Sequence, residues 1–253
     1  MDRFGSSKLR IVWACVAILL FGIVLGGIQG FGGPDGSEFR AFGASVPLGS
    51  MGIMDNARDA ARATLSSSIY TLVPFTILLA SYVPAAEMLQ GERWKGLALG
   101  PAFGLLHGLF YSQVLILPLW ALAYRTLGSF LPGTLALVDL NAVVLGFQLL
   151  LWALALSLLL RSSRGLALLL ALGLKALGGF MAWGGEFLGN PDLFTVPAFL
   201  VKSMAFLGKL LPTGQVSSDP FAWSALPLSV GGPWLLAALL LLIPSKAGKA
   251  RKG

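Results

Sequence analysis

Six long apolar runs, separated by polar connections, constrain this chain more than any other feature of its sequence. About 20 apolar residues in an α-helix are enough to cross the roughly 30 Å hydrocarbon core of a bilayer. Inside lipid the backbone must satisfy its own hydrogen bonds, which a helix does within one segment. We therefore predict an all-α integral membrane protein with six transmembrane helices, at about residues 11–31, 69–88, 97–124, 136–160, 165–183 and 223–243.

The composition leaves little room for a second kind of domain. Hydrophobic residues make up 56% of the 253 residues and charged residues 11%, whereas soluble domains carry about 25% charged residues. Six spans and their connections occupy nearly the whole chain, so residues 1–253 are expected to form a single polytopic membrane domain. The one cysteine, Cys15, lies within the first apolar run and leaves no intrachain disulfide possible.

Lysine and arginine are unevenly divided between the two sets of connections. The N-terminal head, the segment after the second span, the turn at residues 161–164 and the tail carry 11 basic residues, and the alternate loops carry 6 over greater lengths. Cytoplasmic loops hold the excess of basic residues. Both termini are therefore predicted to be cytoplasmic, with an external loop at residues 32–68 and a basic cytoplasmic tail at residues 245–253. The net charge of +7 is then explained by the orientation of the chain in the membrane, and no nucleic-acid partner is expected.

The stretch at residues 184–220, before the last span, is too polar to cross the membrane as a unit. Within it, residues 194–211 are rich in apolar side chains, and Lys202 and Lys209 fall on one helical face. This pattern predicts an external stretch with an interfacial or re-entrant helix. A seventh full span here would move the basic tail outside, so the tail favours six. The last span is expected to be broken by Pro227, Gly231, Gly232 and Pro233.

The short charged segment between the second and third spans carries a more specific pattern. Glu92, Arg93 and Gly96 are followed by Pro101 near the start of a helix of small residues. This pattern resembles the permease subunits of type 2 ATP-binding-cassette (ABC) exporters, also called ABC-2 type transporter permeases. Those proteins usually have Glu-Arg-x-x-Gly-Thr-Leu followed by a proline, and Leu97 stands here in place of the threonine.

The resemblance covers most of the chain. The leucine-rich residues 151–172, which turn at residues 161–164, resemble the fourth and fifth helices of that family. Six spans, a large first external loop and a half-inserted stretch before the last helix also match. The resemblance implies the membrane-spanning permease subunit of an exporter in the cell (inner or plasma) membrane, with a short cytoplasmic coupling helix at residues 90–96 seated in a groove of the ATPase.

The expected ATPase-coupling residues are Glu92, Arg93, Trp94, Lys95 and Gly96. Charged side chains offer charge-assisted hydrogen bonds, and tryptophan is a common anchor of protein interfaces. The alternative interpretation is an ordinary basic loop that only follows the orientation rule.

A phosphate-binding loop of the form GxxxxGK[ST] is absent from the sequence. The chain is therefore expected to be no enzyme and to bind no cofactor or metal itself, with ATP and Mg held by a separate ATPase subunit. The resemblance also implies a second permease, in a homodimer or heterodimer, surrounded by membrane lipid. Two alternatives stay open, a secondary transporter, in which an internal repeat is expected, and a membrane assembly subunit that transports nothing.

Four polar residues within the predicted spans are candidates for lining a transport pathway. Lys175 lies roughly 15 Å from the cytoplasmic end of the fifth span, where an ionisable group is costly. If the fourth and fifth spans form an antiparallel hairpin, equal depth places Gln148 beside it; the lysine could instead snorkel. His107, the single histidine, shares a helical face with Tyr111. A proton relay is conceivable there, but a histidine bonded to a neighbouring helix is the commoner arrangement.

Glycines recur every four residues in two of the spans. Gly22 and Gly26 lie in the first span, and Gly100, Gly104 and Gly108 lie in the third. Small residues at this spacing let another helix approach closely. We expect both faces to pack against helices, and a sliding or gating interface is the alternative use.

Overall fold

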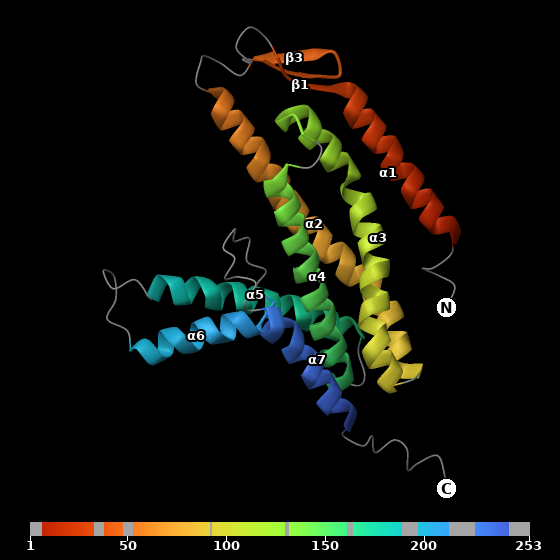
Figure 1. Cartoon of the computed structure of the whole chain (residues 1–253), viewed down its shortest axis with the longest axis vertical. Coiled ribbons are helices and arrows are strands. Elements are labelled where there is room, and N and C mark those ends of the chain that lie inside the picture. Colours follow the sequence, from red (N-terminus) through yellow and green to blue (C-terminus); the bar gives the residue numbers. More distant parts are fainter. Residues whose placement is uncertain are drawn as a thin grey trace. The chain divides into compact units, whose positions relative to one another are not determined.

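The computed structural model describes residues 7–32, 38–47, 53–91, 93–129, 132–160, 164–188, 197–212 and 226–242. In these ranges the chain is helical except for one small sheet (Figure 1). The elements are α1 (Ser7–Gly27), β1 (Ile28–Gly32), β2 (Glu38–Ala41), β3 (Ala44–Pro47), α2 (Ile53–Gly91), α3 (Arg93–Leu127), α4 (Gly133–Leu160), α5 (Arg164–Leu188), α6 (Ala198–Leu210) and α7 (Leu226–Leu242). The predicted tail at residues 245–253 and the turn residues 161–163 lie outside the described residues.

Within the described ranges, four helices are long and apolar enough to cross a membrane, judged by length and composition. Their apolar stretches are Arg10–Gly27 in α1, Ala57–Leu89 in α2, Trp94–Leu127 in α3 and Gly133–Leu160 in α4. They overlap the first four predicted spans, with the first ending earlier and the second beginning earlier than predicted, and the chain is accordingly a helical, membrane-embedded protein. The fifth and last predicted spans correspond to shorter apolar stretches, Gly165–Met181 in α5 and Val230–Leu242 in α7. Six spans with both termini in the cytoplasm stay a prediction.

One of two compact units contains Met1–Thr76 and Gly108–Val143. Here α1 ends at Gly27, before the end of the first predicted span, and the chain continues directly into β1. The strands pair antiparallel in the order β1-β2-β3. The external loop predicted at residues 32–68 therefore contains strands and also the first turns of α2. This sheet was not predicted from the sequence, because β1 continues the apolar run of the first helix.

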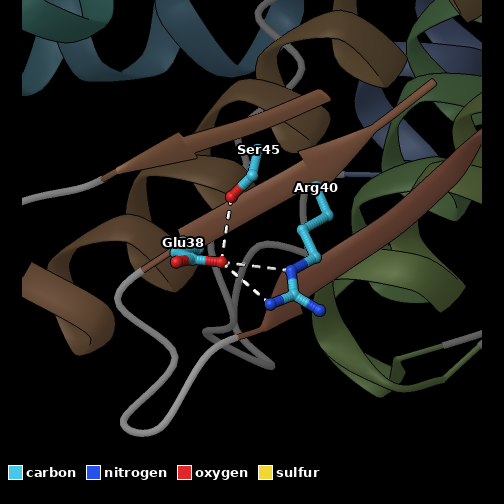
Figure 2. A network of polar contacts seen from close by, with 3 residues as sticks. All are labelled: Glu38, Arg40 and Ser45. Carbon is cyan, nitrogen blue, oxygen red and sulfur yellow. Dashed lines mark hydrogen bonds and ion pairs between the residues drawn. The ribbon is translucent and has the colours of Figure 1, made fainter. Parts of the chain in front are cut away.

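A two-residue turn and a polar network hold β2 against β3. Phe42 and Gly43 form the turn with φ of 51° and 76°, which is typical of the hairpin turns that match strand twist. Arg40 donates from Nε and Nη2 to Oε2 of Glu38 at 3.1 and 2.9 Å, and the Ser45 hydroxyl donates to the same oxygen at 2.9 Å (Figure 2). The hydrogen bond from Arg40, and then that from Ser45, lowers the pKa of Glu38 below its ordinary value of 4.5.

The other compact unit contains Ile77–His107 and Val144–Gly253. Within it α5 and α6 lie side by side and run in opposite directions (Figure 1). They approach closely at Gly184, where a Cβ atom would lie 2.7 Å from Cε of Met204. In Figure 1 the α5–α6 pair runs across the direction of the second half of α4. Because antiparallel helices stay antiparallel in any projection, α5 does not return alongside α4 as the predicted hairpin of the fourth and fifth spans requires.

The last two helices refine the predicted end of the chain. α6 has 13 residues, or about 20 Å at 1.5 Å per residue, which is too short to cross a hydrocarbon core of about 30 Å. It lies at the place of the predicted interfacial or re-entrant helix. α7 is continuous from Leu226 to Leu242 with Pro233 inside it, so the predicted break of the last span is not found. Pro227 lies in the first turn, where no helical N–H is required, and Pro233 removes only one backbone bond.

Candidate functional site

The expected coupling residues lie where α2 meets α3. α2 ends at Gly91 and α3 begins at Arg93, so only Glu92 separates helices of 39 and 35 residues. Glu92 and the side chain of Arg93 lie outside the part of the chain that the structure describes. The segment at residues 90–96 is therefore not the separate short helix that the resemblance implies. It consists of the last residues of α2 and the first residues of α3, called here the α2–α3 turn.

The backbones of α2 and α3 pack closely together beside this turn. A Cβ atom at Gly96 would overlap the carbonyl oxygen of Met88 and lie 2.6 Å from Cα of Leu89. One helical turn further along, a Cβ atom at Gly100 would lie 3.2 Å from the carbonyl oxygen of Ala85. No larger residue fits between backbones at the first of these distances. The glycine face of α3 thus brings the ends of the two helices together.

The packed face continues deeper into α3 and involves α4. A Cβ atom at Gly104 would lie 3.1 Å from Cβ of Ala85, 3.2 Å from the carbonyl oxygen of Ser81 and 3.3 Å from Cδ2 of Leu150. Gly108 is also buried. Gly100 and Gly104 thus lie against the backbone of α2, whereas a packing role for Gly108 stays a prediction. Gly22 and Gly26 of α1 differ, because no described atom lies within 4 Å of a Cβ built at either position.

The start of α3 presents two side chains away from this packing. Trp94 is 56% exposed and Lys95 is also exposed, whereas Gly96 is buried and Leu97 is only 4% exposed. Tryptophan is one of the residues that most often anchor protein interfaces. The start of α3 therefore combines a backbone that packs closely against α2 with an exposed tryptophan.

The polar pathway candidates on α4 and α5 have different environments. Gln148 is buried on α4, with 6% of its surface exposed, and Lys175 is half-buried on α5. Their predicted proximity depends on α5 returning alongside α4, and the crossing direction of α5 in Figure 1 removes that premise. A direct contact between the two residues stays a prediction.

His107 and Tyr111 take part in aromatic contacts. The His107 ring stacks on Phe103, with centroids 6.4 Å apart and planes 13° apart, and Phe103 is 49% exposed. Tyr111 is 8% exposed and meets Trp13 of α1 edge to face at 6.1 Å. Phe103 and His107 both belong to α3, so a bond from His107 to a neighbouring helix stays a prediction, as does a role of either residue in a transport pathway.

One polar pair between membrane helices was not found from the sequence. Gln113 of α3 donates from Nε2 to Oδ1 of Asp139 on α4 at 3.1 Å. Gln113 lies fourteen residues before the end of α3 at Leu127, and Asp139 lies six residues after the start of α4 at Gly133. The two residues are therefore at different distances from the connection between α3 and α4, and a prediction that pairs residues at equal depth would not bring them together. The signal that could have identified this site is Asp139 itself, an acidic residue within a membrane helix.

The chain matches no protein-family model, and neither a search of curated proteins nor a search of solved structures finds a match. The candidate site therefore rests on the geometry of the α2–α3 turn and on the sequence pattern that it carries.

Proposed function

We propose that this chain is the membrane-spanning permease subunit of an ABC exporter, located in the cell membrane, and that separate subunits hydrolyse ATP. The observation that carries the proposal is the α2–α3 turn. Its residues follow the Glu-Arg-x-x-Gly pattern of such permeases, and Trp94 and Lys95 are exposed on a closely packed backbone. A second permease, either another copy or a homologue, completes the pathway in this proposal.

Rigidity of the turn is what the mechanism requires. A force applied by an ATPase to Trp94 would deform a flexible loop without moving the helices behind it. Because the backbone of α3 meets that of α2 at Gly96 and Gly100, the ends of both helices are expected to move together. Closure of the ATPase pair on ATP is then transmitted into the membrane, where the pathway changes between inward-open and outward-open states.

Co-purified ATP hydrolysis tests the proposal. The tagged full-length chain is purified from its own cells in mild detergent, and hydrolysis of Mg-ATP by the preparation is measured. Loss of an interface anchor costs about 2 kcal/mol or more, so Trp94→Ala with Lys95→Ala should lower the retained ATPase activity roughly thirtyfold at limiting concentration. The alternative of an ordinary basic loop predicts full retention.

A matched control excludes a general effect of removing an exposed aromatic residue. Phe206 on α6 is 55% exposed, close to the 56% of Trp94, and Phe206→Ala should leave the ATPase activity unchanged. Equal ATPase activity in the Trp94/Lys95 variant and in the wild-type chain, or no ATPase activity with either, would contradict the proposed function.

A further inference from the structure

Pro101 leaves one backbone carbonyl of α3 without its helical donor. In an α-helix the carbonyl of residue i accepts the N–H of residue i+4, so the carbonyl of Leu97 faces position 101. Proline has no N–H to donate there. Leu97 is 4% exposed and Pro101 is buried, and lipid offers no donor. The start of α3 therefore requires a donor from another element.

Trp234 of α7 supplies this donor. Its Nε1–H donates to the carbonyl oxygen of Leu97 at 3.4 Å, across 137 positions of sequence. An indole has one donor and no acceptor, so this bond uses the whole polar capacity of the side chain. The ring itself is 41% exposed.

The accepting carbonyl lies directly beside the α2–α3 turn. Leu97 follows Gly96, whose backbone meets Met88 and Leu89 at the end of α2. At the other end of the connection, α7 contacts α6, which lies against α5. One hydrogen bond thus joins the packed ends of α2 and α3 to the C-terminal helices.

We infer that Trp234 is a positioning residue that ties α7 to the α2–α3 turn, so that a displacement of the turn is passed to α7 and α6. The source of that displacement rests on the proposed function, whereas the tie itself does not. The bond suits this role because its acceptor has no competing helical donor. The first turn of α3 and the middle of α7 therefore stabilise each other.

Amide hydrogen exchange on the full-length chain in lipid nanodiscs tests the tie without any partner. Trp234→Phe keeps an aromatic ring and removes the N–H. Loss of one hydrogen bond predicts roughly threefold to tenfold faster exchange in the first turns of α3 and in α7 together. Trp152→Phe on α4 is the matched control, because its Nε1 is buried with no hydrogen-bond partner among the described residues. Exchange in Trp234→Phe equal to that in Trp152→Phe overturns the inference.

A second variant separates the tie from local helix stability. Pro101→Ala returns the helical donor to Leu97, so adding it to Trp234→Phe should restore slow exchange at the start of α3 while α7 stays fast. If α7 also recovers its slow exchange, the bond serves only the stability of α3, and the inference fails.

The complex with its ATPase gives the readout that a purely structural bond would not change. In the wild-type complex, Mg-ATP is expected to alter exchange in α7, and the Trp234→Phe/Pro101→Ala variant should bind the ATPase without this response. An equal response in both complexes contradicts the inference. If no ATPase accompanies the wild-type chain, the proposed function fails, and the exchange results on the chain alone still decide whether the tie exists.

Discussion

The glycine faces of α1 and α3 have the same four-residue spacing and different surroundings. On α3, Gly96, Gly100 and Gly104 bring the backbone against α2, whereas no described atom lies within 4 Å of a Cβ built at Gly22 or Gly26 of α1. α3 follows α2 after one residue, so the connection itself supplies the partner helix. α1 instead leads into a sheet. Glycine spacing permits close packing, and chain connectivity decides whether a helix is there to pack.

α1 is joined to α3 by hydrogen bonds from single side chains, whereas α3 packs against α2 along a whole face. Nε1 of Trp13 donates to the carbonyl oxygen of Tyr111 at 3.4 Å, and Nε of Arg125 donates to the carbonyl oxygen of Leu25 at 2.7 Å. Leu25 lies in the last turn of α1, where carbonyls have no helical donor. Only 6% of the apolar stretch of α1 is buried, against 33% for that of α3. Separate point contacts and a continuous backbone contact should therefore respond differently to substitution.

Gly96→Ala should have the largest effect. Its Cβ atom meets the backbone of Met88 and Leu89, which cannot move aside as a flexible side chain can. Overpacking of this kind costs about 3 kcal/mol at the upper end of its usual range, and thermal unfolding in detergent measures the loss. Gly26→Ala on the open face of α1 is the control. Equal unfolding temperatures for the two variants would show that the face of α3 is no tighter than that of α1.

Arg125→Met should have the next largest effect. It removes the two guanidinium donors to the carbonyl of Leu25 and leaves the long apolar stem in place. Loss of a charged hydrogen bond costs about 2 kcal/mol. The loss should be concentrated in the last turn of α1, where faster amide exchange would report it. Unchanged exchange from Leu25 to Gly27 would contradict a capping role for this arginine.

Gly22→Ala and Gly26→Ala should raise stability slightly. With no described neighbour within 4 Å of either Cβ, each alanine gains helix propensity of about 0.5–1 kcal/mol without a clash. Chemical unfolding of the purified chain would measure the gain. A loss of stability in the assembled complex alone would instead reveal a partner helix seated on this face.

The smallest expected effect is the acid sensitivity of the sheet beside α1. Hydrogen bonds from Arg40 and Ser45 lower the pKa of Glu38 in the folded chain, so its stabilising contribution is present above the ordinary pKa of 4.5. The contribution is lost as the pH falls through the lowered folded pKa. Amide exchange in β2, corrected for intrinsic rates, should become faster in acid, and Glu38→Gln should remove this pH dependence. The same acid response in Glu38→Gln would assign it to another group.

The long helices were predictable because length and hydropathy alone select them. The apolar runs of α1 to α4 need backbone bonds within the membrane, and no other local structure provides them. The end of α1 at Gly27 was not predictable, because Ile28 and Phe31 continue the same apolar composition into β1. The continuity of α7 through Pro233 was also not predicted, because a proline lowers the probability of a helix without forbidding it.

Contacts between helices were predictable only where the connection is very short. One residue between α2 and α3 makes the two helices neighbours, and the glycines of α3 then identify the contact face. The turn at residues 161–164 suggested the same for α4 and α5, yet α5 crosses the direction of the second half of α4 and pairs with α6. The bond from Trp234 to Leu97 spans 137 positions. Because Pro101 has no N–H, the sequence identifies the carbonyl of Leu97 as an acceptor without a helical donor. No local feature of the sequence identifies Trp234 as the residue that donates to it.

Cross-linking from the α2–α3 turn tests the central claim most directly. A photoreactive aromatic residue replaces Trp94 in the full-length chain, and the same residue replaces Phe206 as the control; both variants are irradiated in native membranes. We predict that the position of Trp94 gives a covalent adduct with a polypeptide that binds ATP, and that the position of Phe206 gives none. Adducts with lipid alone from the position of Trp94, or labelling of that position by an impermeant reagent outside intact cells, would contradict the account.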